Sequence, residues 1–426
     1  MSNPTVEVPP STTAALAKRD LAVDFARVVS VVVVVMTHML MVGVGIGSDG
    51  NIIVSEPLTP QPWFPVATLF LQIMPLFFIL GGFSSLTSWR SLQRRGGTAA
   101  DYIRNRVIRL ARPAIPVFIF FAVAINVTAA FVDPTFLNGV VTGIGTPLWF
   151  VAAYILCQLF VPLMARLHEA APWRTLAALA AGAVLVDALR YSLNQEWIGL
   201  ANLFFVWLFV SQLGFLYADG FFFRIGRARV AAIGAAAAAV LSAIIISGLY
   251  VADMLHNLNP PTVPLMLLGV IQISVLVLIH PALTKLMQRK PARVFTFLFG
   301  TRLMTIYLWH MTCLILVTGV TLLIPDAAPA PATEGWWLSR PFVLIATFIL
   351  VFILSKYVAR FENDPVVPRK AGEDVSLLNA VISAALVFAP AFYVMRNGLD
   401  GYVAVAGVIA FTAAVLLVIP RKLPTA

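Results

Sequence analysis

Long uninterrupted apolar stretches constrain this chain more than any other feature of its sequence. Runs such as residues 28–35, 231–246 and 342–354 lie inside apolar windows of about 20 residues, the length that a helix needs to cross a hydrocarbon core of ~30 Å. Inside a bilayer the backbone must satisfy its own hydrogen bonds, and continuous stretches of this length do so as helices, not as barrel strands. The composition agrees, because 60% of the residues are hydrophobic, only 11% are charged and the mean hydropathy is +0.92. We therefore predict an all-α polytopic membrane protein.

The apolar windows predict about twelve transmembrane helices. They lie near residues 21–44, 66–88, 113–132, 147–166, 173–190, 200–218, 230–251, 263–280, 301–324, 339–359, 376–394 and 401–420. The fifth is the least regular, because Asp187 and Arg190 fall within it. We divide the chain into a disordered cytoplasmic tail (residues 1–18), a core of ten helices (19–366), and two further helices with a short tail (367–426).

The basic residues predict how the helices are oriented. If the N-terminus lies inside, nearly all Lys and Arg fall in the cytoplasmic gaps, and only Arg190, Arg340 and Arg396 fall outside, with Arg27 inside the first span. This asymmetry is the one that the positive-inside rule describes. We therefore expect a multi-pass protein of the plasma (inner) membrane with both termini in the cytoplasm. The same asymmetry accounts for the net charge of +10, so nucleic acid is not expected as a partner.

The two cysteines, Cys157 and Cys313, each stand within an apolar run. Neither a disulfide framework nor the Cys spacing of a metal site is present, so the sequence predicts buried free thiols and no metal. His168, His256 and His280 lie at predicted loops or helix ends, and we assign them no role.

The first span carries three ionisable residues, Asp24, Arg27 and His38. The eleven steps from Arg27 to His38 turn through about 1100°, which is within ~20° of whole turns, so both lie on one helix face. Asp24 precedes Arg27 by three residues and shares that face. Ionisable groups inside a membrane are costly, and a neutral imidazole can act as a general base. The alternative is an interfacial Asp24–Arg27 ion pair, with His38 as a packing residue that forms a hydrogen bond.

A series of short motifs follows the first span in order. They are residues 74–83 (MPLFFILGGF), 104–113 (RNRVIRLARP), 148–150 with Tyr154 (LWF…Y), 306–310 (IYLWH) and 361–365 (FENDP). Together with the spacing of Asp24, Arg27 and His38, they resemble the membrane acyltransferase-3 family over roughly residues 19–366. Two details depart from the family pattern: Leu303 stands where a Ser is expected, and one extra residue separates Glu362 from Pro365.

Members of that family transfer an acyl group, usually acetyl from acetyl-CoA, to a hydroxyl of a sugar or glycan. The resemblance implies that His38 is the catalytic base and that Arg27 and Asp24 complete the catalytic group. Acetyl-CoA or another acyl-CoA would be the co-substrate. The acceptor would be an extracytoplasmic glycan, a glycolipid or a related metabolite, and the sequence does not choose among them.

The stretch from Arg90 to Arg112 holds seven Arg and a single acid, Asp101. We assign Arg104, Arg106, Arg109 and Arg112 to binding the phosphates of CoA, because guanidinium groups suit phosphate oxygens. Contact with lipid headgroups explains the same charges equally well.

Small and aromatic residues complete the predicted site. Gly81 and Gly82 are assigned to close approach of the pantetheine chain, with close helix packing as the alternative. Trp149 and Tyr154 are assigned to the acceptor site, although an interfacial aromatic belt has the same composition. Tyr307 and His310 are further substrate-site candidates, and a structural role for His310 stays open. For Glu362 we expect a structural ion pair at the cytoplasmic end of the tenth span.

A proton-coupled secondary transporter is the alternative class, because twelve spans with buried Asp24, Arg27 and His38 also suit proton relay. The segment after the second span lacks the Gly-x-x-x-Asp-Arg pattern of the major facilitator superfamily, and no repeat relates the two halves. The last two helices could serve homo-oligomerisation, partner docking or acceptor selection.

Overall fold

The structure is a computed structural model that describes residues 20–131, 145–362 and 375–419. Twelve helical spans in this part of the chain are long and apolar enough to cross a membrane, which confirms the predicted fold class and number of spans. They are α2 (Leu21–Met41), α3 with α4 (Phe64–Leu71 and Met74–Gln93), α5 (Ala99–Thr128), α7 (Trp149–Ala170), α8 (Pro172–Leu193), α9 (Asn202–Ala218), α11 (Arg227–Ile246), α12 (Val263–Leu286), α14 (Leu303–Leu322), α15 (Glu334–Val358), α16 (Leu377–Asn397) and α17 (Gly401–Val418). The direction in which the bundle faces stays a prediction from charge.

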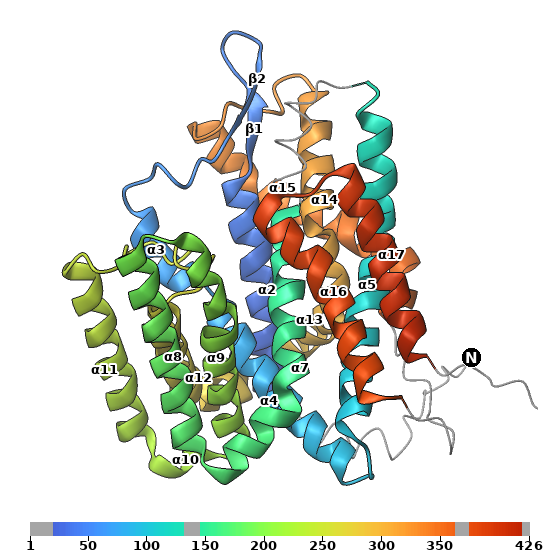
Figure 1. Ribbon diagram of the computed structural model, residues 1–426. Coiled ribbons are helices and arrows are strands. Elements are labelled where there is room, and N and C mark those ends of the chain that lie inside the picture. Colours follow the sequence, from blue (N-terminus) through green and yellow to red (C-terminus); the bar gives the residue numbers. More distant parts are fainter. Residues whose placement is uncertain (1–19, 132–144, 363–374, 420–426) are drawn as a thin grey trace, which may run out of the picture.

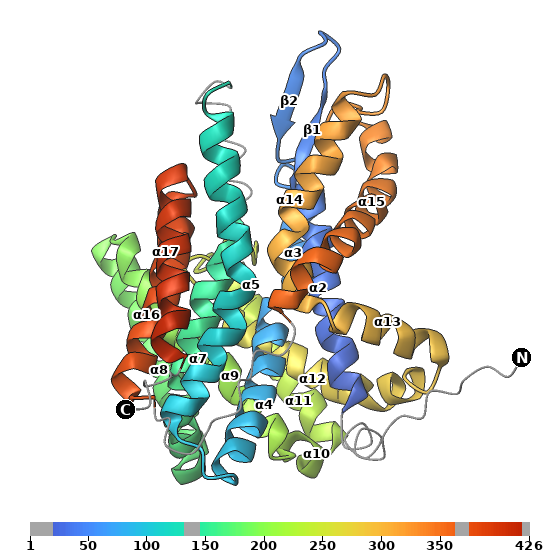
Figure 2. The same cartoon turned by 90° about the vertical axis from the view of Figure 1, so that its right-hand side faces the viewer.

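Short elements connect the spans. They are the strands β1 (Gly43–Ile46) and β2 (Ile52–Ser55), the helices α10 (Phe221–Ile225) and α13 (Lys290–Gly300), and the 3₁₀ turns η1 (Thr146–Leu148), η2 (Glu196–Ala201) and η3 (Ala359–Phe361). The strands form an antiparallel hairpin that pairs Gly43 with Ser55 and was not predicted. The hairpin projects from one end of the bundle, and α13 crosses the direction of the neighbouring spans near the other (Figure 2).

Helix α2 occupies the middle of the bundle (Figure 1). Helices α8, α9, α11 and α12 gather on one side of it, and α5, α16 and α17 on the other. Its neighbours include α4, α12, α14 and α15. The first span therefore meets both halves of the bundle, which places its polar residues where distant segments of the chain converge.

The second span is broken between α3 and α4, at Gln72 and Ile73. Pro75 explains the break, because its ring removes a backbone donor and clashes with the carbonyl four residues earlier. The side chain of Gln272, on α12, satisfies the freed backbone groups: Leu76 N donates to Oε1 (2.8 Å) and Nε2 donates to Gln72 O (2.8 Å). Irregular backbone at membrane depth is tolerated only where protein groups satisfy it in this way.

The third span begins earlier than the apolar window predicted, at Ala99 and not near residue 113. A capping box starts it, in which the Thr98 hydroxyl accepts from Asp101 N and the Asp101 carboxylate accepts from Thr98 N. Such a cap supplies partners for the orphan donors of the first turn and stabilises a helix that begins in a polar segment. The Arg-rich run is therefore helical and continuous with the span.

Helices α16 and α17 pack against α5 and α7 and belong to the same bundle. The rings of Phe118 and Phe411 lie 4.9 Å apart, and Gly407 leaves room for the Phe118 ring. Arg104 Nε donates to the carbonyl of Val418 (2.8 Å). The last two helices thus cover the outer side of the third span.

Candidate active site

Asp20 starts the first span and ties it to two other helices. Its carboxylate accepts from the backbone N–H groups of Ala22 and Val23, which is the usual N-cap arrangement. The same carboxylate accepts from the Tyr217 hydroxyl (3.0 Å) and from His280 Nε2 (3.1 Å). Because these partners lie on α9 and α12, the depth and rotation of α2 are held by long-range contacts.

His38 forms a pair with His310 at the far end of α2. The distance from His38 Nδ1 to His310 Nε2 is 2.9 Å, and the rings are stacked with centroids 5.1 Å apart. His310 Nδ1 lies 2.6 Å from the carbonyl oxygen of Tyr307, so Nδ1 must be the donor there. In the neutral pair, His310 Nε2 is then an acceptor and His38 Nδ1 donates to it. His38 Nε2 is then the unprotonated nitrogen of the ring, and its lone pair can accept a proton.

A cavity of about 40 Å³ lies beside His38. Trp149 and Tyr307 line it together with residues 71–74, which form the break in the second span. The N-terminal end of α4 therefore faces the space next to the imidazole. The first donors of α4 already have partners, because Met74 N donates to Gln72 Oε1 (3.2 Å) and Leu76 N donates to Gln272 Oε1 (2.8 Å).

Arg27 lies near the opposite end of α2, where the positive-inside rule places the cytoplasm. One of its Nη atoms donates to the Leu80 carbonyl (2.9 Å) and to the Ser84 hydroxyl, both on α4. These bonds hold the guanidinium against the second span. Asp24 lies beside it, and both side chains line two separate cavities.

The two cavities carry further cations. The first, of about 330 Å³, is lined by Arg293 from α13. The second, of about 290 Å³, is lined by Arg106 and Arg109 from α5. Arg27 stands between them and contributes to both. The arrangement brings guanidinium groups from three distant segments to one end of the first span, where they could hold an anion beside the carboxylates of Asp20 and Asp24, which line the same space.

The structure separates the four predicted CoA-binding arginines. Arg106 and Arg109 line the second cavity, and Arg112 is outside the lining of both. Arg104 is buried against α17 and donates to Val418 O, which gives it a packing contact away from the cavities. Position on the helix explains why Arg104 differs from Arg106, since residues two apart do not share a face.

The two glycines of α4 differ in their surroundings. A Cβ at Gly82 would lie 2.2 Å from Ser211 O, so this glycine permits the close contact between α4 and α9. A Cβ at Gly81 would meet only the Tyr154 ring, at 3.3 Å. Gly82 therefore serves close helix packing, which was the alternative to a role in binding the pantetheine chain. Gly81 instead borders Tyr154, a side chain of the predicted site.

Aromatic rings connect the two ends of the site. Tyr154 stacks on Phe150 (centroids 5.3 Å apart), and Phe150 packs against Tyr307 at 4.7 Å. Tyr307 in turn lines the cavity beside His38 and donates its hydroxyl to Pro147 O (2.5 Å). Tyr154 lies at the Gly81 end of this series and outside the lining of the His38 cavity.

Glu362 binds the start of another helix, and the predicted ion pair stays a prediction. Its carboxylate accepts from the backbone N–H groups of Met304 (2.9 Å) and Thr305 (3.0 Å) and from the Thr305 hydroxyl (2.5 Å). These are the first residues of α14, so Glu362 caps the helix that carries His310. The sequence reveals no such cap, because donor and acceptor are far apart along the chain.

A family model described as an acyltransferase domain, acyltransferase-3, matches residues 20–356. The chain belongs to the acyltransferase-3 family. It is a multi-pass membrane acyltransferase, a class that replaces the transporter alternative. The match ends within α15 and leaves α16 and α17 outside it. No curated protein and no solved structure matched the chain.

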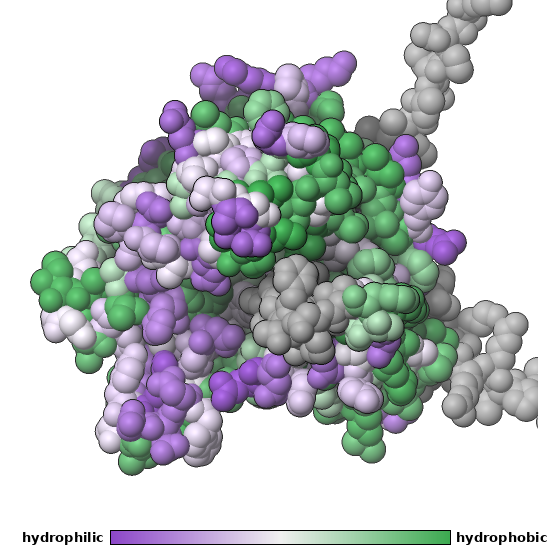
Figure 3. Space-filling view, turned by 90° about the horizontal axis from the view of Figure 1, so that it is seen from above, coloured by the Kyte–Doolittle hydropathy of each residue, from purple (hydrophilic) through white to green (hydrophobic). Residues whose placement is uncertain are grey.

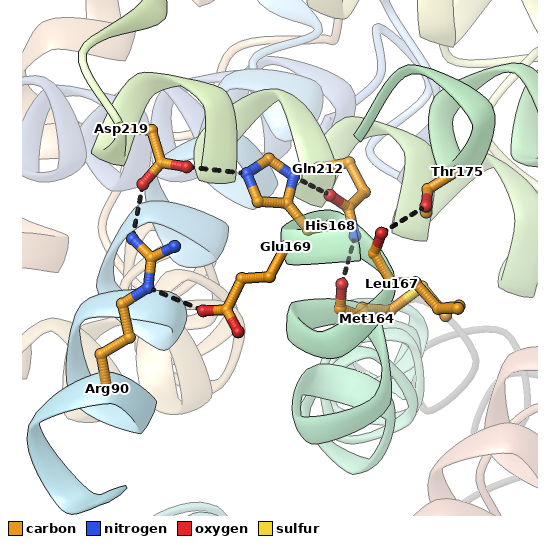
Figure 4. A network of polar contacts seen from close by, with 8 residues as sticks. All are labelled: Arg90, Met164, Leu167, His168, Glu169, Thr175, Gln212 and Asp219. Atoms are coloured by element: carbon orange, nitrogen blue, oxygen red, sulfur yellow. Dashed lines mark hydrogen bonds and ion pairs between the residues drawn. The ribbon is translucent and has the colours of Figure 1, made fainter. Parts of the chain in front are cut away.

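This acyltransferase also contains a polar network that sequence reasoning missed (Figure 4). His168 Nδ1 lies 2.9 Å from Gln212 Oε1, and its Nε2 lies 3.0 Å from Asp219. Asp219 also accepts from Arg90 (2.5 Å), which bonds Glu169 as well (3.2 Å). The network joins α4, α7 and the end of α9 at the predicted cytoplasmic end.

The Asp219 carboxyl of this network has a lowered pKa. Burial alone would raise its pKa, but the hydrogen bonds from Arg90 and His168 outweigh burial, and the pKa lies below its ordinary value. The hydrogen bonds from Arg90 and His168 therefore keep Asp219 ionised. Among the described residues of the acyltransferase, no cluster of three His, Cys, Asp or Glu could hold a metal ion.

Proposed function

We propose that this acyltransferase moves an acyl group, acetyl being the expected one, from cytoplasmic acyl-CoA to an extracytoplasmic hydroxyl across the plasma membrane. The acceptor would be a glycan, a glycolipid or a related metabolite, and His38 would be the general base. The hydrogen-bond chain from Tyr307 O through His310 to His38 carries this proposal, because it leaves His38 Nε2 ready to accept a proton. Catalytic bases in other enzymes are oriented by such partners.

The cation-lined end of α2 supports an acyl-CoA as the donor. Arg27, Arg106, Arg109 and Arg293 line two adjoining cavities at the predicted cytoplasmic end. CoA carries phosphate groups that suit guanidinium donors, and its thioester lies at the end of a long flexible arm. Gly81 and the aromatic series from Tyr154 mark the direction in which that arm would extend towards His38.

The reaction follows from the state of the His38 ring. The acceptor hydroxyl gives its proton to His38 Nε2 while its oxygen bonds to the thioester carbonyl carbon. The former carbonyl oxygen carries a negative charge in the intermediate. When the carbon–sulfur bond breaks, His38 returns the proton to the CoA sulfur, which leaves free CoA and the ester.

The test combines donor binding with turnover. Acetyl-CoA should raise the melting temperature of the purified protein in detergent, and His38→Ala should lose transfer by at least about 10²-fold while it keeps this shift. Arg27→Ala should weaken both properties. His256→Ala is the matched control, because His256 is exposed in a loop. If His38→Ala transfers acetyl as fast as wild type, or if neither acetyl-CoA nor CoA changes melting, the proposed function is wrong.

A further inference from the structure

A pocket of about 500 Å³ lies between the β1–β2 hairpin and α14. We call it the hairpin pocket. Met311, Ile315 and Gly319 line it from one face of α14, and Ile52 and Val54 line it from the hairpin. Its volume is within the range of small-molecule sites, which are also mostly apolar with a few polar groups. None of these residues has a part in the proposed donor site.

Two residues that line the hairpin pocket are close in sequence to the histidine pair. Met41, which lines it, follows His38 by three residues, or about 4.5 Å along α2. Met311, on the opposite wall, directly follows His310. A molecule held there would have one end within a helical turn of the proposed base. The pocket continues away from the cation-lined cavities, towards the end that charge predicts to be extracytoplasmic.

The walls of the pocket suit a hydrocarbon and not a hydrated polysaccharide. Glu56 is the only charged residue among those that line it. The hairpin side chains that face it are strongly exposed, with 53% of Ile52 and 56% of Val54 accessible. Apolar residues also reach the surface among polar ones at this end of the molecule (Figure 3). Exposed apolar surface of this kind marks contact with a ligand or with lipid.

We propose that the hairpin pocket binds the hydrocarbon body of a hydrophobic or amphipathic acceptor whose hydroxyl reaches His38. The inference rests on the proposed function and narrows its acceptor class. Flexible Met41 and Met311 side chains can adapt to an alkyl chain. Glu56, which also accepts from the Thr59 hydroxyl (3.0 Å), offers a carboxylate to a second polar group of the acceptor.

Gly319 provides a precise way to fill the pocket. No atom lies within 4 Å of a Cβ built at this residue, so Gly319→Leu adds a side chain to open space without strain. The matched control is Val320→Leu, one residue later, where 54% of the side chain is exposed on another face of α14. Melting temperature and the acetyl-CoA shift should be the same in both variants.

The experiment uses decyl β-D-glucoside and methyl β-D-glucoside as acceptors for protein in lipid nanodiscs. We expect kcat/KM for the decyl compound to exceed that for the methyl compound at least tenfold. Gly319→Leu should abolish this advantage, whereas Val320→Leu should retain it. Partition of the decyl chain into the bilayer is equal for both variants, so only a pocket effect separates them. Binding of a fluorescent dansyl-undecanoic acid probe to His38→Ala protein gives a second readout.

The outcomes distinguish the two proposals. Transfer that is indifferent to chain length, or equal in the Gly319 and Val320 variants, overturns the acceptor assignment and leaves the acyltransferase mechanism standing. Probe binding that depends on Gly319 without competition from decyl glucoside shows a site for bilayer lipid and likewise overturns the assignment. Absence of any response to acetyl-CoA is a failure of the proposed function itself.

Discussion

The carbonyl oxygen of Tyr307 decides which nitrogen of His38 is free. It accepts from His310 Nδ1, so His310 must present a lone pair to His38 Nδ1–H. The tautomer of His38 depends on both histidines together, and the two are 272 residues apart in the chain. The sequence identified both residues by their membrane location but left the relation between them open.

Removal of the His38 partner should affect catalysis and spare donor binding. His310→Phe leaves the His38 ring without its acceptor, and turnover should fall by about 10²-fold or more because the wrong nitrogen can carry the proton. His310→Gln, whose amide oxygen can accept from His38, should recover part of the rate. Acetyl-transfer kinetics with a parallel acetyl-CoA melting shift provide the measurement. Equal loss in the Phe and Gln variants would contradict an orienting role.

Asp219 makes stability depend on pH. Its pKa is lower in the folded protein than in the unfolded chain, so its contribution is complete above the unfolded value of about 4 and is lost as pH falls through the folded value. The melting temperature of wild type should therefore decrease from about pH 5 to pH 3 more steeply than that of Asp219→Asn. Parallel curves for the two proteins over that range would show that the carboxylate does not contribute.

At the scale of elements, the number of spans was predictable and the helix ends were not. Hydrophobic windows identify a span because crossing the bilayer demands about 20 apolar residues. They fail at Ala99, where the Thr98–Asp101 capping box begins a helix in a charged segment. They also miss the hairpin, because four-residue strands leave only a short pattern. The packing of Gly82 against Ser211 depends on which helices are neighbours in the fold, and the local sequence does not contain that information.

The break in the second span should depend on one side chain of another helix. Gln272→Leu leaves Leu76 N and Gln72 O without their partner, at a cost of about 1–3 kcal/mol for each buried group. We expect a lower melting temperature and, because residues 71–74 line the His38 cavity, lower turnover. Val275→Leu, an exposed position on the same helix, is the control. Unchanged melting in Gln272→Leu would mean that water or another group satisfies the break.

At the scale of the whole molecule, twelve spans place both ends of the described chain at the same end of the bundle, opposite the hairpin. The positive-inside rule predicts that this end is cytoplasmic and that the hairpin is extracytoplasmic. The composition and charge pattern were sufficient for this prediction. The site was predictable only in part, because it assembles from the first, second, third, fourth and ninth spans, and their mutual contacts leave no trace in local periodicity.

Labelling of single cysteines tests the orientation. Asn51→Cys at the hairpin turn should react with a membrane-impermeant maleimide in intact cells, whereas Arg95→Cys after α4 should react only in permeabilised cells. The native Cys157 and Cys313 are buried and give a low background. The opposite pattern would invert the topology and, with it, the side from which a donor could enter.

The cap that Glu362 places on α14 has a consequence for biosynthesis. The histidine pair joins the first span to the ninth, and the ninth begins on a carboxylate that follows the tenth. Translation must therefore pass His310 before the two imidazoles can meet, and it must pass Glu362, beyond the family-matched region, before α14 has this cap. In the proposed mechanism, a nascent or prematurely terminated chain would lack the oriented His38 and would not consume acyl-CoA.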